Sequence, residues 1–280
     1  MRVHILIACY NRKRLTLSSI MGATQCASAA GMDVSFTVFD DGSTDGTGAA
    51  IANLPIEAKI IRGDGDAYWA RSMAIAEAAI LCDAETKHSD FILWLNDDVV
   101  LDASALARLE NCIDANPGSV VVGAVRDPGN GEITYSGMRR NGSHPLRFAR
   151  VNPTERAQAV DTFNGNIVAV PVAVARRLEG IDGDFSHGLA DIDYGLRCNW
   201  LGIPVLLAPG TFGTCPRNEP PARGSALEDW HRFTGRKGGG NFASLRRIIV
   251  KGHPVVWPIF VAGTYGLWWG RRIIGGISRK

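Results

Sequence analysis

The chain has 280 residues and a net charge of +2, with 46% hydrophobic and 21% charged residues, which excludes a disordered chain and is typical of a globular protein with a core of its own. This length suits one large domain, or one domain with an appendage. The six cysteines are scattered without the spacing of a zinc site or a disulfide framework, so we expect reduced thiols in the cytoplasm.

The first half of the chain alternates apolar runs of strand length with segments of helical pattern. Its first run is too short for a signal peptide and has its basic residues after it, so we interpret it as a strand. The expected strands span residues 3–8, 34–39, 58–62 and 91–95, and the expected helices cover about 15–27, 49–54, 70–82 and 103–115. This alternation predicts an α/β fold with a doubly wound, mostly parallel sheet.

Three of these apolar strands end in polar residues, at 10–11, 40–41 and 96–98. Ligands of open α/β sheets bind beyond the carboxyl ends of the strands, so the three ends are expected to meet at one edge and form a site. Asp97 and Asp98 repel each other beside an apolar sheet unless a cation shares them. A divalent ion that also binds a substrate diphosphate would be such a cation. Taken alone, however, the Asp pair is explained equally well as a polar strand end before the next helix.

The second half of the chain is less regular. Apolar or alternating runs predict strands at 120–125, 132–140, 146–150, 167–170 and 203–208, and the pattern of 189–201 predicts a helix. Pro171 fits the first turn of a further helix.

Five short motifs give the chain a resemblance to a known family. They are ACYNR (8–12), DDGSTD (40–45), GDAYW (65–69), WLNDD (94–98) and ADID (190–193). In this order they resemble the family 2 glycosyltransferases, inverting enzymes with the GT-A fold, and most of all the transferases of bacterial surface polysaccharides, including rhamnosyltransferase-like members. The resemblance implies a GT-A domain over residues 1–215, with a Rossmann-like, mostly parallel central sheet flanked by helices. Residues 216–280 would form a basic, aromatic-rich helical extension.

The resemblance also implies the roles of individual residues. Tyr10 and Asp41 would hold the nucleotide base, with Asp41 accepting from a base N–H. Asp97 and Asp98 would bind Mn²⁺ or Mg²⁺, with Asp98 as the direct ligand, and Asp191 falls where the family has its general base. The residues expected to bind the nucleotide sugar are Ala8, Tyr10, Asn11, Arg12, Asp41, Gly65, Arg71 and Asp97. For Arg71, an exposed surface position is an equally good interpretation.

The chain departs from the family pattern at two positions. Ala190 stands where the family usually has Glu, and Ser72 where it often has Asn. Both departures bear on the acceptor more than on the class of reaction.

Helical geometry separates the two carboxylates of the last motif. Positions two apart on a helix differ by about 200°, so Asp191 and Asp193 are expected to face different surroundings. Asp193 lies four residues before Arg197, the spacing of an ion pair within a helix, and is expected to be structural. Asp191 lies in the first turn, where a helix N-terminus favours an ionised carboxylate, as a resting base requires.

The extension has a different charge balance from the body. From Arg217 onward there are 12 Lys and Arg against 3 Asp and Glu, a net charge of +9. Residues 254–270 are uncharged and rich in Trp, which suits a helix lying on an anionic membrane, while a helix packed on the body is equally plausible. A membrane span is the third interpretation, because Pro and Gly interrupt the segment.

We therefore expect a metal-dependent inverting glycosyltransferase that moves a sugar from a nucleotide-sugar donor to a glycan or lipid-linked acceptor. The acceptor would be chosen by residues 126–164, the enzyme would lie in the cytoplasm or at the cytoplasmic face of the inner membrane, and no nucleic acid is expected as a partner. One alternative is a sugar-phosphate nucleotidyltransferase, which needs a basic, Gly-rich loop after the first strand, where this chain has CYNR. The other is a non-catalytic sugar-nucleotide-binding subunit, which would be expected to lack one of Asp97, Asp98 and Asp191.

Overall fold

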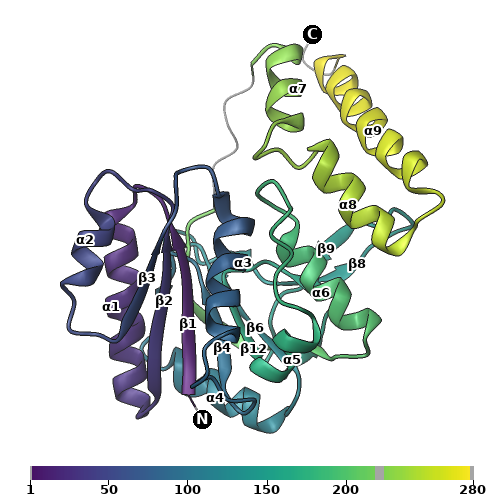
Figure 1. The fold of residues 1–280 in the computed structure, drawn as a ribbon. Helices are drawn as coiled ribbons and strands as arrows, with labels where there is room; N and C mark the ends of the chain where they lie inside the picture. Colours follow the sequence, from purple (N-terminus) through teal and green to yellow (C-terminus); the bar gives the residue numbers. More distant parts are fainter. Residues whose placement is uncertain (1, 218–223, 278–280) are drawn as a thin grey trace.

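The computed structural model describes residues 2–217 and 224–277 (Figure 1). Its main sheet has the order β10-β13-β6-β12-β4-β1-β2-β3, with β5 paired to β13 and β7 to β6. The strands of this sheet are β1 (Arg2–Cys9), β2 (Asp33–Asp40), β3 (Ala58–Arg62), β4 (Phe91–Leu95), β5 (Val100–Leu101), β6 (Val120–Arg126), β7 (Ile133–Tyr135), β10 (Gln158–Ala159), β12 (Ile167–Pro171) and β13 (Val205–Thr214). A small second sheet has the order β11-β8-β9, with strands β8 (Gly137–Arg140), β9 (Phe148–Arg150) and β11 (Thr162–Phe163).

Helices cover both faces of the main sheet. They are α1 (Lys13–Ala30), α2 (Thr47–Ala52), α3 (Tyr68–Leu81), α4 (Ala105–Ala115), α5 (Val172–Arg177) and α6 (Ala190–Trp200), followed by α7 (Ala226–Thr234), α8 (Phe242–Gly252) and α9 (Trp257–Ile277). Buried side chains of α1, α2 and α4 belong to the core on one face, and those of α3, α5 and α6 to the core on the other. The predicted α/β architecture is confirmed.

Strand β4 consists of five consecutive apolar residues because both of its faces are buried. Phe91, Leu93 and Leu95 point into one core, while Ile92 and Trp94 point into the other. Successive side chains of a strand face opposite sides, so a strand covered on both faces must be apolar throughout. The parallel partners β1 and β4 place their carboxyl ends, and the polar residues that follow them, at the same edge.

The second half differs from the sequence prediction in several details, among them the short strands β10 and β11, which were not predicted. The expected strand 132–140 is broken at Ser136, because β7 pairs with β6 in the main sheet whereas β8 pairs with β9 in the small one. Pro171 ends β12 and is the N-cap of α5, so it lies just before the helix instead of in its first turn. The last strand continues to Thr214, past the predicted end at 208, because it passes through two irregularities in its pairing with β6.

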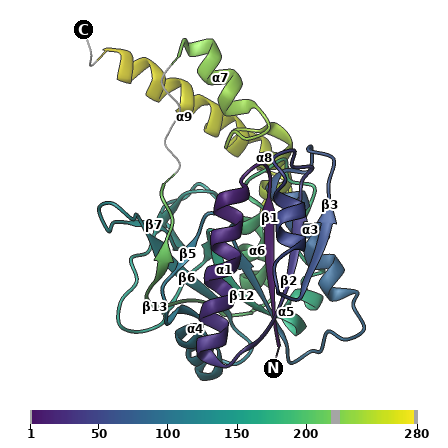
Figure 2. The same ribbon diagram turned by 90° about the vertical axis from the view of Figure 1, so that its left-hand side faces the viewer.

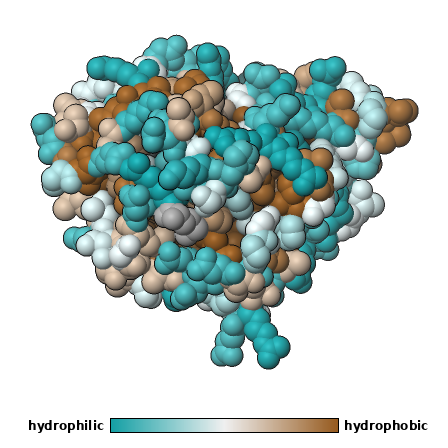
Figure 3. Space-filling model, turned by 60° about the horizontal axis from the view of Figure 1, so that its bottom comes forward, coloured by the Kyte–Doolittle hydropathy of each residue, from teal (hydrophilic) through white to brown (hydrophobic). Residues whose placement is uncertain are grey.

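The extension packs on the body through α8. Leu245, Ile248 and Ile249 are buried in the same core as α3 and α6. Figure 2 shows α7 and α9 beyond α8, at the end of the molecule where the parallel strands have their carboxyl ends. The opposite end, in Figure 3, carries mainly hydrophilic residues between separate apolar patches. Over the described residues, no helix combines the length and the apolar character needed to cross a membrane.

Candidate active site

The loops that follow β1 and β2 are joined by Asn11. Its backbone N–H donates to Ser43 Oγ at 2.9 Å, and its side-chain oxygen accepts from the Thr44 N–H at 2.8 Å. Asn11 has a φ of 51°, a left-handed conformation that Asn tolerates better than most residues. The polar residue expected to contact the nucleotide sugar therefore also holds two loops of the site together.

Asp41 holds the third loop, the one that follows β3. Its carboxylate accepts from the backbone N–H groups of Gly65 at 3.1 Å, Tyr68 at 3.0 Å and Ala67. The two loops are so close that a Cβ at Gly42 would lie 2.9 Å from the Gly65 nitrogen. Asp41 is buried, and its role toward a nucleotide base stays a prediction.

The Tyr10 side chain is exposed beside Gly65. Its ring is 52% exposed, and a Cβ on Gly65 would lie 3.9 Å from its Cε2 atom. An exposed ring beside a glycine offers a flat surface on which a base can stack. Ala8 is partly buried near the end of β1, and Arg71 is exposed on α3, so their contacts to a donor stay predictions.

Asp97 and Asp98 share a cation that belongs to the chain itself. Arg12 Nη1 lies 3.1 Å from Asp97 Oδ1 and 3.0 Å from Asp98 Oδ2. Burial raises the pKa of the Asp97 carboxyl to about 6, although Arg12 lowers it. Cys215 Sγ donates to the other oxygen of Asp98 at 3.4 Å.

The pair fits a divalent ion that is completed by a substrate. Mg²⁺ and similar ions are commonly bound by one or two carboxylates together with substrate phosphates. No group of three or more His, Cys, Asp or Glu side chains in the described part of the chain could hold a metal by itself. Asp97 and Asp98 would therefore hold the ion only together with a diphosphate, and Arg12 would have to give up these oxygens.

Asp191 is connected to the carboxylate pair through the amino end of β12. Its Oδ2 accepts from the Gly165 N–H at 3.1 Å. The next residue, Asn166, accepts through its carbonyl from the Asn96 N–H at 3.1 Å, immediately before Asp97. The predicted base and the predicted metal ligands thus lie on two sides of one hydrogen-bonded segment.

The ionisation of Asp191 differs from the expectation. Burial raises the pKa of this carboxyl above its ordinary value, and the backbone N–H groups of Ile192 and Gly165 oppose the shift without cancelling it. The favourable effect expected from the helix N-terminus is therefore outweighed by the loss of water around the carboxylate.

Sequence reasoning missed Cys215 and Gly165 as parts of the site. Trp69 Nε1 donates to Asn96 Oδ1 at 3.0 Å, and a Cβ on Gly165 would lie 2.7 Å from the Trp69 ring. The run NGN before the strand at 167 was a usable signal. Because β12 is antiparallel to β4, its amino end lies at the edge where the parallel strands have their carboxyl ends.

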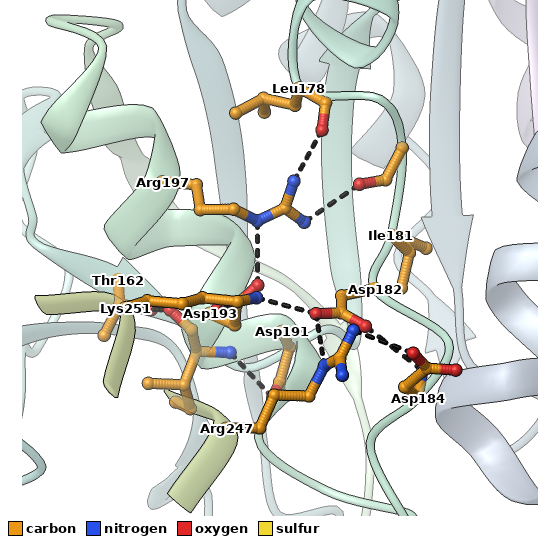
Figure 4. A network of polar contacts seen from close by, with 12 residues as sticks. Thr162, Leu178, Ile181, Asp182, Asp184, Asp191, Asp193, Arg197, Arg247 and Lys251 are labelled. Atoms are coloured by element: carbon orange, nitrogen blue, oxygen red, sulfur yellow. Dashed lines mark hydrogen bonds and ion pairs between the residues drawn. The ribbon is translucent and has the colours of Figure 1, made fainter. Parts of the chain in front are cut away.

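Asp193 is structural, as predicted. It is fully buried, with Oδ2 at 2.7 Å from Arg197 Nε and Oδ1 at 2.7 Å from Lys251 Nζ on α8. Figure 4 shows how Asp182 joins the same network, because it contacts both Lys251 and Arg247. Burial raises the pKa of Asp182, but hydrogen bonds from Arg247 and Lys251 outweigh it and lower the pKa to about 2.

We expect Asp193→Asn to lower the free energy of unfolding by about 3 kcal/mol, because breaking a buried ion pair leaves its cations without compensation. Urea denaturation measures this. Asp184→Asn is the matched control, since Asp184 is 76% exposed in its pair with Arg247 and should cost less than about 1 kcal/mol. Equal losses for the two variants would show that Asp193 is not structural.

Comparisons with known proteins agree with this architecture. The sequence profile named Glycosyl transferase family 2 matches residues 4–177. The fold is the GT-A fold of nucleotide-sugar glycosyltransferases, to judge from the solved structures that it resembles. The chain belongs to glycosyl transferase family 2. The family and the fold inferred from the motifs are thus confirmed.

Three solved structures give the extent of the likeness. TarS 1-349 of S. aureus in complex with UDP-GlcNAc is 13% identical, with a TM-score of 0.59 over 90% of this chain and 66% of that chain. The mannosyltransferase PcManGT from Pyrobaculum calidifontis in complex with GDP-Man and Mn²⁺ is 16% identical, with a TM-score of 0.56 over 94% and 69%. GalNAc-T7 with UDP, GalNAc and Mn²⁺ is 13% identical, with a TM-score of 0.62 over 89% and 47%.

The chain thus spans just under two thirds of the length of TarS 1-349. No curated protein matches it.

Proposed function

We propose that the protein is a metal-dependent inverting glycosyltransferase that uses a nucleotide-sugar donor. The observation that carries this proposal is the hydrogen-bonded segment that joins Asp191 through Gly165 and Asn166 to Asn96, the residue immediately before the Asp97–Asp98 pair. The resemblance to proteins whose structures contain UDP-GlcNAc, or GDP-Man with Mn²⁺, supports the same class of donor.

The chemistry requires two groups on opposite sides of a sugar carbon. The leaving group is a nucleoside diphosphate, and a divalent ion stabilises the charge that develops on it. Asp191 would take the proton of the acceptor hydroxyl as its oxygen attacks from the opposite side. The Arg12 guanidinium lies between Asp97 and Asp98 and would also stabilise the charge that develops on the leaving diphosphate.

A binding screen tests the class of donor. The protein is screened with UDP, dTDP and GDP sugars, each in the presence of Mn²⁺. We expect the sugars of one nucleotide class to raise its melting temperature, because binding to the native state adds to stability. No shift with any of these donors would contradict the proposed function.

We also propose a lipid-linked glycan acceptor in surface polysaccharide biosynthesis and a location at the cytoplasmic face of a membrane. All six cysteines are free thiols, which suits a reducing compartment. On α9, Ile259 is 70% exposed and Ile273 is 60% exposed. They are 14 residues, or about four turns, apart and so lie on the same side of the helix. An apolar face within a segment of positive charge suits an anionic membrane.

We assign the proposed membrane contact to the exposed side of α9. In α8, Leu245, Ile248 and Ile249 are buried in the core of the body, whereas Ile259 and Ile273 of α9 are exposed. We expect Ile259→Glu with Ile273→Glu to abolish cosedimentation with anionic liposomes at low salt. Met21→Glu is the control, because Met21 is 50% exposed on α1. A membrane role is contradicted if wild-type protein stays in the supernatant, or if all variants sediment alike.

A further inference from the structure

A large cavity lies between the extension and the body. Its volume is about 1370 Å³. The lining comes from the turn between β8 and β9, from Leu189 just before α6, and from α7, α9 and the residues around Lys237. His144 closes one side, because its Nε2 lies 3.2 Å from the Phe260 carbonyl and 3.1 Å from Thr264 Oγ1 on α9.

The walls of this cavity are strongly basic. Arg147, Lys237 and Arg271 line it, and in the described part of the chain no carboxylate lies within ion-pair distance of them. The one acidic residue among the lining residues, Asp229, is engaged by Arg272 at 3.1 Å and by Arg232. Three cations thus face the cavity without a carboxylate partner among the described residues, an arrangement that suits an anionic ligand.

The same cavity has an apolar side. Phe148, Leu267 and Trp268 contribute to its lining. Leu267 is also 56% exposed, so the apolar lining continues onto the outer surface of α9. A ligand with an anionic group and an apolar chain could place the anionic group against the basic residues, while the apolar chain extends along α9.

The cavity borders the candidate active site. Arg236 forms an ion pair with Asp66, and Lys237 Nζ lies 5.6 Å from the centre of the Tyr68 ring, both in the loop that Asp41 holds. On the other side, Leu189 lines the cavity and immediately precedes the helix that carries Asp191. The turn at 236–239 therefore separates the donor loop from the cavity.

We propose that this cavity binds the acceptor, and that the acceptor carries a phosphate or diphosphate joined to an apolar chain. This inference rests on the proposed transferase function and names the chemical class of its second substrate. Arg147, Lys237 and Arg271 bind the phosphate oxygens, and Phe148, Leu267 and Trp268 contact the first part of the chain. The expected influence of residues 126–164 on the acceptor then acts through Arg147 and Phe148.

Calorimetry with farnesyl diphosphate, a short isoprenoid diphosphate, tests the proposal. The buffer contains EDTA so that the Asp97–Asp98 pair does not bind the diphosphate through a metal. We expect wild-type protein to bind farnesyl diphosphate at least tenfold more tightly than either pyrophosphate or farnesol. Arg147→Gln and Arg271→Gln should each weaken binding about tenfold, as removal of a hydrogen bond to a charged group does.

Matched variants separate this site from general charge effects. Arg156→Gln is the control, since Arg156 is exposed in the loop before β10 and does not line the cavity. Arg147→Lys and Arg271→Lys keep the charge and should keep most of the affinity. Melting temperatures establish that the glutamine variants are folded. A Leu267→Ser variant tests the apolar side independently, because it should lose affinity for farnesyl diphosphate but not for pyrophosphate.

Three results would overturn the proposal: no binding of farnesyl diphosphate, equal binding by the glutamine variants and Arg156→Gln, or binding of pyrophosphate as tight as that of farnesyl diphosphate. If the glutamine variants lose only their affinity for anionic vesicles, the cavity is a contact for lipid headgroups and the acceptor proposal fails. Titration of UDP and GDP with Mn²⁺ separates this from the transferase function. The cavity variants should bind UDP or GDP as tightly as wild-type protein does. If wild-type protein binds neither nucleotide, only the proposed function is contradicted.

Discussion

Replacing Asp191 with asparagine is expected to lower the rate of sugar transfer by about 10²–10⁴-fold, the usual contribution of a general base. Asparagine has nearly the same shape and can accept the Gly165 N–H, but it cannot take a proton from a hydroxyl. Donor affinity and melting temperature should stay unchanged, because Asp191 does not contact Arg12 or the Asp97–Asp98 pair. The rate of transfer to the acceptor is measured from the amount of nucleoside diphosphate released.

The pH dependence of the same reaction gives a second readout. Burial raises the pKa of Asp191, so the carboxyl keeps its proton to a higher pH than an ordinary aspartate does. A protonated carboxyl cannot act as a base, so the rate should fall as the pH drops through this pKa. With Mn²⁺ and donor at saturating concentrations, so that Asp97, whose pKa is about 6, stays bound to the ion, this fall in rate should be absent in Asp191→Asn.

The control for this variant is Asp114→Asn, which changes an exposed carboxylate on α4. It should leave both the rate and the pH profile as in wild-type protein. Near-normal turnover of Asp191→Asn would overturn the assignment of the base.

Asp98→Asn should remove the part of nucleotide affinity that depends on Mn²⁺, while the fold is retained. An amide in place of this carboxylate removes one of the two charges that attract the ion, and it leaves Arg12 free to pair with Asp97 alone. Calorimetry with the preferred nucleoside diphosphate, with Mn²⁺ and with EDTA, measures the difference. We expect wild-type protein to bind much more tightly with Mn²⁺, and Asp98→Asn to bind equally weakly in both buffers.

Asp114→Asn is again the control, and it should respond to Mn²⁺ as wild-type protein does. If Asp98→Asn keeps the full gain in affinity from Mn²⁺, Asp98 is not a metal ligand.

The first half of the fold could be predicted because its signals are local. Each apolar run from β1 to β4 is followed by a polar end and a helix, and parallel strands bring those ends to one edge without further information. The separation of Asp191 from Asp193 followed in the same way from helical geometry. The pairing of Asp193 with Arg197 confirmed it.

Long-range neighbours could not be predicted. The place of β12 between β4 and β6, antiparallel to both, depends on how the whole sheet assembles, and it brings Gly165 and Asn166 into the site. Cys215 meets Asp98 across 117 residues, and no pattern in either segment indicates this. The pKa of Asp191 also depends on what covers it, because helix position alone does not determine the loss of water.

The extension illustrates the same limit. Its charge and its aromatic residues are visible in the sequence, but they do not say which helix is buried. In the structure, Lys251 on α8 reaches the buried Asp193, while α9 buries Val261 and leaves Ile259 and Ile273 exposed. The position of the cavity between them depends on contacts such as that of His144 with α9, which no local pattern predicts.

The stereochemistry of the released sugar tests the central claim most directly. Nucleotide-sugar transferases hydrolyse their donors slowly with water as the acceptor, and proton NMR distinguishes the anomer formed first. With the donor that stabilises the protein best, and with Mn²⁺, we predict that the first sugar released has the anomeric configuration opposite to that in the donor. This release should be strongly reduced in Asp191→Asn. Release with the configuration of the donor, or equal release by Asp191→Asn, would contradict an inverting reaction with Asp191 as its base.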